Sequence, residues 1–307
     1  MLPSSPPFSS PRIVDSHQHA NWCGRSAASL VDDLREHSIT YAWLLTWCLG
    51  PTEEPGRHLH YFNPIHYQSD LPHPGMPLGD VVAACSAFPT RFVAGYCPHP
   101  LWPDAPRLLE AAHSVHGVRV CGEWKFRLAF DDPRCLELFR AAGALHMPVV
   151  LHLDVPYLLD LEGKPQYQPE WYGGTWENLE RALRACPQTT FIGHAPGFWR
   201  EISGDADTEP QAYPKGPITA GGRLGRLFAD YPNLWADLSA ESGRTALARD
   251  PAHAVRFLTQ HADRLLFGRD FYGGKLQDLL ATLPLPPSVV DAICWRNAER
   301  LVPPPPA

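Results

Sequence analysis

The chain lacks several features that would assign it to common classes of protein. No block of lysine and arginine stands out, and 26 basic residues against 33 acidic ones give a net charge of −7 with histidine neutral. A nucleic-acid-binding protein normally presents a basic face, so that class of partner is disfavoured. No apolar run reaches about 18 residues, so no segment is expected to span a membrane.

The eight cysteines form no Cys-x-x-Cys pair, and several lie inside expected strands or helices. Free cysteine in such places behaves as a small buried apolar residue, so we expect reduced thiols and no disulfide framework. The Ser/Pro-rich start, Met1 to Pro11, has neither a basic region nor an apolar run and is not expected to act as a signal peptide. These features favour a cytoplasmic protein.

What the 307 residues do contain is a repeated alternation of apolar runs and amphipathic helical patterns. The expected strands cover 13–17, 41–47, 92–97, 117–125, 148–153, 190–194, 234–238 and 264–268. Helical patterns cover 27–37, 79–88, 106–115, 134–145, 176–185, 223–231, 252–261, 275–283 and 288–301. This order predicts an α/β fold, a (β/α)8 TIM barrel in a single domain over residues 12–302, with flexible tails at 1–11 and 303–307. An open doubly wound sheet is the alternative.

Three expected connections, after strands 2, 5 and 6, are unusually long: 48–78, 154–175 and 195–222. Loops after barrel strands form the face that holds the active site, so long ones there usually shape a pocket. Disordered insertions are the alternative, disfavoured because these loops contain aromatic residues such as Trp171 and Tyr172. Trp199, soon after the sixth strand, is a candidate substrate-binding residue, and simple packing is its other interpretation.

The most informative motif is Asp15-Ser16-His17-Gln18-His19, at the end of the first strand. Alternate side chains of a strand share a face, so His17 and His19 are expected to point the same way. Two imidazoles side by side at the carboxyl end of a strand can bind one divalent metal ion. The motif therefore predicts a metalloenzyme.

Further candidate ligands lie at the ends of other expected strands. His152 ends the fifth strand, His194 ends the sixth, and Asp270 follows the eighth. A single histidine after an apolar strand is more often structural. Because barrel strands converge at one mouth, however, residues that share this topological position become neighbours, and coincidence is a poor explanation for the set.

The expected fourth strand adds a charged row, with Glu123, Lys125 and Arg127 on one face. Charges on a buried strand are costly unless they are paired or face the open mouth. Glu123 is a candidate metal ligand, and Lys125 would be one only if carbamylated. The alternative is an ion network that supports the metal ligands.

These motifs resemble the amidohydrolase superfamily, and most closely its amidohydrolase-related branch, which includes aminocarboxymuconate-semialdehyde decarboxylase. The resemblance runs from Val14 to about Leu301. Its specific elements are Asp-Ser-His-Gln-His at 15–19, Phe-Pro-Thr-Arg-Phe-Val at 88–93, Val-Leu-His at 150–152, Gly-His at 193–194, Ala-Asp-Leu-Ser at 236–239 and Gly-Arg-Asp at 268–270.

The resemblance implies one divalent ion, usually zinc, bound by His17, His19, His152 and Asp270. It also implies that His194 lies beside the metal-bound water or substrate and helps to activate it. The Gly-Glu pair at 122–123 departs from this branch and looks more like TatD-type hydrolases, in which the glutamate serves a metal pair. A second ion, held through Glu123, is therefore an open alternative.

The leading hypothesis is a metal-dependent hydrolase that uses metal-activated water to attack an amide, ester or lactone carbonyl of a small molecule. Zinc lowers the pKa of bound water to roughly 7, Asp270 can accept its proton, and His194 can bind a developing oxyanion. The alternative is a non-oxidative decarboxylase of an aromatic or unsaturated acid, with Lys125, Arg127 and Arg269 as candidate carboxylate anchors. A TatD-like nuclease is a weaker alternative, and a non-catalytic barrel fits an intact ligand set poorly. Barrels of this kind often pair, so a homodimer is compatible with the sequence.

Overall fold

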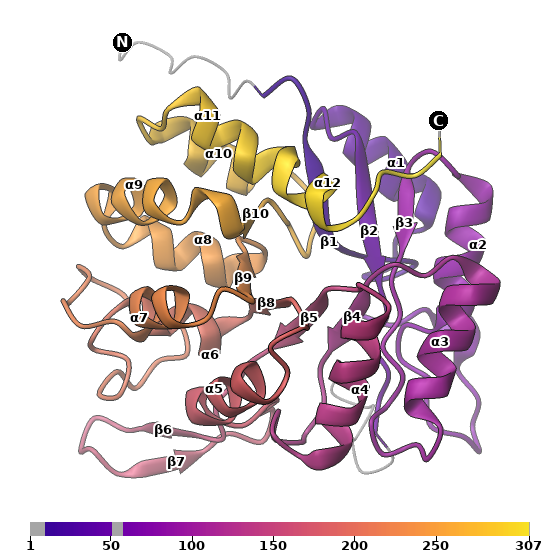
Figure 1. Cartoon of the computed structure of the whole chain (residues 1–307), viewed down its shortest axis with the longest axis horizontal. Coiled ribbons are helices and arrows are strands. Elements are labelled where there is room, and N and C mark those ends of the chain that lie inside the picture. Colours follow the sequence, from indigo (N-terminus) through magenta and orange to yellow (C-terminus); the bar gives the residue numbers. More distant parts are fainter. Residues whose placement is uncertain (1–9, 51–57, 307) are drawn as a thin grey trace.

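The barrel strands follow the apolar segments of the sequence closely. The computed structural model describes residues 10–50 and 58–306. Within them lie all eight expected barrel strands: β1 (Val14–His19), β2 (Tyr41–Leu45), β3 (Phe92–Ala94), β4 (Cys121–Trp124), β5 (Val149–His152), β8 (Phe191–His194), β9 (Leu234–Asp237) and β10 (Leu265–Leu266). The hydrogen-bonded pairs among them run parallel, as Figure 1 shows.

The strands form two arcs that join into a closed ring. One arc has the order β1-β2-β3 and the other β10-β9-β8-β5-β4. Between β3 and β4, Gly95 and Val120 form a parallel bridge. Between β10 and β1, the amide of Ser16 donates to the carbonyl of Phe267 at 2.9 Å. These contacts close the sheet, so the predicted (β/α)8 barrel is confirmed and the doubly wound alternative is wrong.

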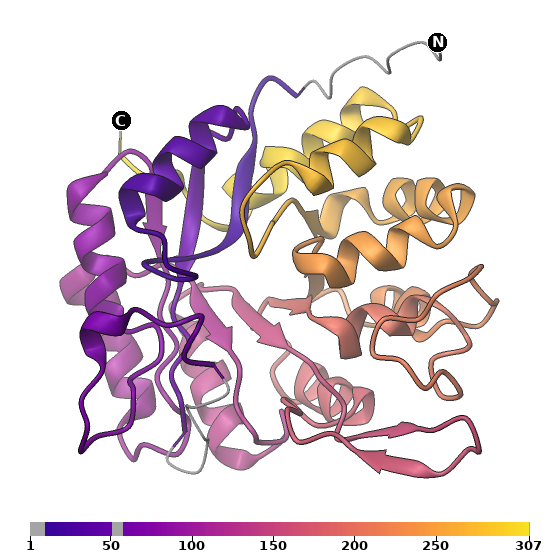
Figure 2. The same cartoon turned by 180° about the vertical axis from the view of Figure 1, so that it is seen from behind.

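Helices surround the ring on its outside (Figures 1 and 2). Those predicted from the sequence are α1 (Ala27–Glu36), α2 (Leu78–Ala87), α3 (Ala105–His116), α4 (Pro133–Ala144), α5 (Trp176–Ala185), α7 (Arg223–Asp230), α9 (Pro251–Gln260) and α10 (Lys275–Thr282). The expected last helix is a run of α11 (Pro287–Asp291), a π-helical turn η5 (Ala292–Arg296) and α12 (Asn297–Leu301). Two further helices, α6 (Pro196–Trp199) and α8 (Ala240–Ala248), were not expected. No helix of the described residues is both long enough and apolar enough to cross a bilayer.

The buried apolar residues form two layers, one on each side of the strands. Inward-facing residues such as Trp43, Val150 and Ile192 make a compact cluster with Ala298 and Val302 from the end of the chain. The alternate strand residues pack against the surrounding helices in a larger cluster. Both faces of each strand are thus covered, which explains why the strands are continuously apolar in sequence. A packed interior leaves only the strand ends free to form a site.

The long loops after β2, β5 and β8 contain structure of their own. The first holds a 3₁₀ turn, η2 (Pro64–His66), although residues 51–57 of this loop lie outside the described residues. The second holds an antiparallel hairpin of β6 (Tyr157–Leu159) and β7 (Pro165–Tyr167), which projects from the barrel in Figure 1. The third begins with α6 and a 3₁₀ turn, η3 (Arg200–Ile202). Of the predicted tails, residues 1–9 and 307 lie outside the described residues.

Candidate metal centre

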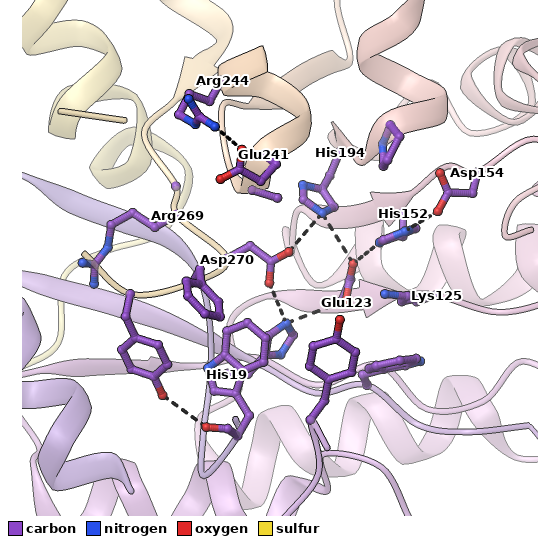
Figure 3. Close-up of a pocket in the computed structure, with 18 of the residues that line it drawn as sticks. His19, Glu123, Lys125, His152, Asp154, His194, Glu241, Arg244, Arg269 and Asp270 are labelled. Atoms are coloured by element: carbon purple, nitrogen blue, oxygen red, sulfur yellow. Dashed lines mark hydrogen bonds and ion pairs between the residues drawn. The ribbon is translucent and has the colours of Figure 1, made fainter. Parts of the chain in front are cut away.

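A cavity of about 620 Å³ opens at the carboxyl ends of the barrel strands. His19, Glu123, His152, His194 and Asp270 line it, and Figure 3 shows their side chains converging from separate strands. The first four lie in the last two residues of their strands, and Asp270 follows the end of β10 by four residues, as the barrel topology allows. Aromatic side chains from the long loops form much of the remaining wall.

β1 delivers His17 and His19 to this cluster, and both are almost completely buried. The Nδ1 atom of His17 lies 2.9 Å from Asp237 Oδ2, and that of His19 lies 2.9 Å from the carbonyl oxygen of Leu45. An acceptor at Nδ1 favours the tautomer that keeps its proton there. Both rings therefore present Nε2 to the interior of the cluster.

Asp237, at the end of β9, also orients His194. Its Oδ1 atom lies 3.0 Å from His194 Nδ1, and Ser239 Oγ lies 2.7 Å from the same nitrogen. Burial lowers the pKa of His194, but the charge of Asp237 and the hydrogen bond to it outweigh burial and raise that pKa to about 10. The pKa of Asp237 shifts down, because the charges of His194 and His17 overcome the effect of its own burial. Asp237 and Ser239 thus fix the orientation of the His194 ring.

Two carboxylates lie between the imidazoles. Asp270 Oδ1 is 3.3 Å from His19 Nε2 and 3.7 Å from His17 Nε2, and its Oδ2 is 3.5 Å from His194 Nε2. Glu123 is 3.8 Å from the Nε2 atoms of both His19 and His194. Its Oε1 atom lies 2.5 Å from His152 Nδ1.

Both carboxylates are held in the ionised form. Burial raises the pKa of Asp270, but the charge of His17 and hydrogen bonds from the neighbouring histidines hold it well below its usual range. Burial likewise raises the pKa of Glu123, and the charges of Lys125 and His152 outweigh it and hold that pKa well below its usual range. The cluster thus concentrates negative charge in a buried place, which is costly unless a cation or imidazolium compensates it.

The donor set fits a divalent cation. Ligand atoms of His17, His19 and Glu123 all lie within 4.8 Å of one another, and so do those of Glu123, His152 and His194. His17 Nε2 is buried and makes no hydrogen bond with any residue that the structure describes. Imidazole nitrogen with carboxylate oxygen is a combination that zinc and similar transition metals prefer. Because Glu123 belongs to both groups, the arrangement can accommodate one ion or two.

Comparison with known proteins agrees with this geometry. A family model described as Amidohydrolase matches residues 79–303. The chain belongs to the amidohydrolase family. No curated protein sequence matches it.

Solved structures similar to this chain share its fold at low sequence identity. An uncharacterised TIM-barrel protein from Bordetella bronchiseptica has a TM-score of 0.61 at 17% identity, covering 95% of this chain and 98% of that one. The 5-carboxyvanillate decarboxylase of Sphingomonas paucimobilis has a TM-score of 0.57 at 14% identity, covering 95% and 99%. A probable 2-pyrone-4,6-dicarboxylic acid hydrolase from Acinetobacter baumannii has a TM-score of 0.55 at 13% identity, covering 94% and 98%. At such identities these likenesses concern the fold alone.

Of Lys125, Arg127 and Trp199, the residues expected to bind substrate, Lys125 lines the cavity. Its Nζ atom lies 4.1 Å from the centroid of the Trp47 ring and 5.3 Å from that of Tyr172. Arg127 and Trp199 are not among the described residues that line the cavity, so their assignment to substrate binding stays a prediction without support from this geometry.

The position of each of these two residues has a local cause. β4 ends at Trp124, and the chain turns so that the amide of Leu128 donates to the carbonyl of Phe126. The strand alternation that would have aligned Arg127 with Glu123 therefore stops before Arg127. Trp199 is buried in the larger apolar cluster between the strands and the helices, and its Nε1 donates to the carbonyl of Asp237 at 3.0 Å.

Arg269, considered as a carboxylate anchor, already has partners. Its Nε donates to Asp15 Oδ2 and its Nη1 to Asp33 Oδ2, each at 2.7 Å. These buried ion pairs tie the segment after β10 to β1 and α1. Arg269 touches the cavity, but its charge is already balanced.

Sequence reasoning missed Asp154, which lies two residues beyond His152. Its Oδ2 atom is 2.9 Å from His152 Nε2, and it lines the cavity. The signal that could have found it is the His-x-Asp spacing, because positions two apart share a face where a strand ends. The same spacing identified His17 and His19.

Proposed function

We propose that this chain is a metal-dependent hydrolase that acts on an amide, ester or lactone carbonyl of a small molecule. The observation that supports this most is the convergence of three Nε2 atoms, from His17, His19 and His194, on the carboxylates of Asp270 and Glu123. A divalent cation, for which we propose zinc, would supply Lewis acidity and make water reactive near neutral pH.

The ligand set has two versions. The resemblance to the amidohydrolase-related branch implies one ion on His17, His19, His152 and Asp270. The two ligand groups that share Glu123 support a second ion beside the first, between Glu123, His152 and His194. Elemental analysis of the purified protein separates these versions, because it counts ions per chain.

Asp270 and His194 are the residues to which we assign catalytic roles. The Asp270 side chain is 19% exposed, so it reaches the cavity while its oxygens contact the buried imidazoles. It can take the proton of an attacking water and return it to the leaving group. In the one-ion version, His194 is held by Asp237 at Nδ1, directs Nε2 at the same place and can donate a hydrogen bond to an oxyanion.

Lys125 is the candidate anchor for a negatively charged part of the substrate. It forms no ion pair with any carboxylate among the described residues, and aromatic faces of Trp47 and Tyr172 hold its ammonium group beside the cavity. A cation held this way can still pair with an incoming anion. The cavity volume of about 620 Å³ suits a small molecule and not a polymer.

Non-oxidative decarboxylation of an aromatic or unsaturated acid is the second candidate. It is favoured by the position of Lys125, which could hold a carboxylate near the centre, and by a similar fold in a protein named as a decarboxylase. The same buried imidazole and carboxylate set could serve either reaction.

Product analysis with the zinc-loaded protein tests the proposal. A panel of aryl lactones, aryl esters, anilides and hydroxylated aromatic acids is incubated in ¹⁸O-labelled water, with Asp270→Asn as control. Incorporation of label into a carboxylate product, lost in the control, supports hydrolysis. Release of carbon dioxide, with no label in any organic carboxylate product, supports the second candidate. A purified protein that binds no divalent metal would contradict both.

A further inference from the structure

His152 meets the cluster through a different ring nitrogen from the other three histidines. Those three have Nδ1 occupied by Asp237 or by the carbonyl of Leu45, and they present Nε2. In His152 it is Nδ1 that lies 2.5 Å from Glu123 Oε1, and Nε2 lies 2.9 Å from Asp154 Oδ2. The ring is thus turned end for end relative to the others.

We propose that Asp154 is the positioning residue that fixes this reversed orientation. His152 has a carboxylate at each ring nitrogen, Glu123 at Nδ1 and Asp154 at Nε2. A cation bound on the Glu123 side would displace the proton from Nδ1, so the proton would stay on Nε2 with Asp154 and the Nδ1 lone pair would be left for the metal centre. Asp154 would then do for His152 what Asp237 does for His17 and His194. This inference rests on the proposed metal-dependent function, because it assigns His152 Nδ1 as the atom that binds the cation.

Asp154 is well held for such a role, although it follows the end of β5. Its amide donates to the carbonyl of Tyr172 at 3.0 Å, and the amide of Tyr172 donates back at 2.9 Å. Its Oδ1 atom accepts from the amide of Gly197, at the start of α6, at 3.3 Å. The Tyr172 ring also packs edge-on against His152, with centroids 5.3 Å apart. Backbone pairing therefore fixes the carboxylate before it meets the imidazole.

The position of Asp154 differs from that of Asp237 in one respect that helps to test it. The side chain of Asp237 is fully buried, whereas that of Asp154 is 25% exposed and lines the cavity. Replacement of a partly exposed carboxylate by an amide leaves no deeply buried polar group unsatisfied, so Asp154→Asn is expected to fold. Its effects on metal binding can then be separated from unfolding.

Zinc affinity measured by competition with a chromophoric chelator is the first test. We expect at least one zinc-binding step of Asp154→Asn to weaken by about 10- to 100-fold relative to the wild type. The matched control is Glu241→Gln, which removes a carboxylate from the same cavity wall where it pairs with Arg244 and Lys275. Glu241→Gln should stay within about two-fold of the wild type, and equal affinities of Asp154→Asn and the wild type would overturn the inference.

A double-mutant cycle tests whether Asp154 acts through His152. If it does, Asp154→Asn should weaken zinc binding in the wild type but add little in a His152→Ala background. Additive losses in the double variant would show that Asp154 acts by a separate route, and the inference would be wrong.

Long-range ¹H–¹⁵N spectra of the zinc-loaded wild type give a test that needs no variant. We expect the proton of His152 on Nε2, and the protons of His17 and His19 on Nδ1. A His152 proton on Nδ1 contradicts the role of Asp154 even if zinc binds normally. A wild type that binds no zinc would instead contradict the proposed function itself, so the two failures are distinguishable.

Discussion

The backbone conformation of Asp270 determines where its carboxylate points. This residue adopts a left-handed backbone conformation, with φ of +47°, and its amide donates to the carbonyl of His17 at 2.9 Å. Non-glycine residues in this region are uncommon and persist where the surroundings hold them. Here that conformation turns the carboxylate toward the imidazoles of β1 and the open cavity.

Asp270→Asn is expected to abolish most turnover and to leave metal binding largely in place. The amide keeps the shape of the side chain but cannot accept a proton, and loss of a general base typically costs about 10²- to 10⁴-fold in rate. Turnover of whichever substrate the product screen identifies, with zinc content measured in parallel, checks this. A variant that keeps both zinc and full activity would show that Asp270 has no part in proton transfer.

At the scale of elements, Glu180 joins α5 to α7. Its oxygens accept from the Arg226 guanidinium at 3.0 Å and from the Tyr231 hydroxyl at 2.7 Å. Hydrogen bonds from Arg226, with that from Tyr231, outweigh burial and lower the pKa of Glu180 to about 2. Because the folded-state pKa is depressed, the stabilisation is present above the usual carboxylate range, near 4.5, and is lost as pH falls toward 2.

Glu180→Gln should therefore lower the free energy of unfolding near pH 6 by about 1 kcal/mol, since solvent screens pairs of this kind. The difference from the wild type should shrink as the pH is lowered from 5 toward 2. Urea unfolding at several pH values measures it. Glu137→Gln, on the exposed face of α4, is the control and should change little at any pH. A difference for Glu180→Gln that does not vary with pH would contradict this account.

Gly193, in β8, leaves room for the ring of Phe198 from α6. A Cβ atom on Gly193 would lie 2.1 Å from Cε2 of the Phe198 ring. We expect Gly193→Ala to displace that ring and to destabilise the protein by about 1–3 kcal/mol. Gly225→Ala, in α7, meets no atom within 4 Å and should be neutral or stabilising. Equal melting temperatures for the two variants would show that Phe198 moves aside without cost.

The sequence predicts those elements whose residues face the core, and misses those that are mostly exposed or too short to show a periodic pattern. The barrel strands are buried on both faces, so their apolar runs are visible directly. The hairpin of β6 and β7 has mostly exposed residues and therefore no apolar pattern to find. α6 has four residues, too short for helical periodicity. The cluster of His17, His19, His152, His194, Asp270 and Glu123 was predictable because each position lies near the carboxyl end of a barrel strand. The turn that follows β4, which takes Arg127 away from the cavity wall, leaves no such pattern in the sequence.

At the scale of the whole molecule, the candidate metal centre lies where the first and last strands of the barrel meet. β1 and the segment after β10 are linked by the bond from Asp270 N to His17 O and by the ion pair of Arg269 with Asp15, at 2.7 Å. A cation held by His17, His19 and Asp270 would add a further link between the first and last strands. Metal binding should therefore stabilise the closed ring and not only the catalytic site.

Chelation is accordingly expected to lower the melting temperature of the whole protein. A free metal concentration about 1,000 times the dissociation constant stabilises the folded protein by about 4 kcal/mol. Removal of the metal should therefore lower the melting temperature of a barrel of this size by roughly 5 to 10 °C. Calorimetry with and without chelator measures the fall, and added zinc should restore the original value. In the double variant His17→Ala, His19→Ala the chelator should have almost no effect, because two of the imidazoles assigned to the cation are gone. A variant as sensitive to the chelator as the wild type would place the bound metal somewhere other than the mouth of the barrel.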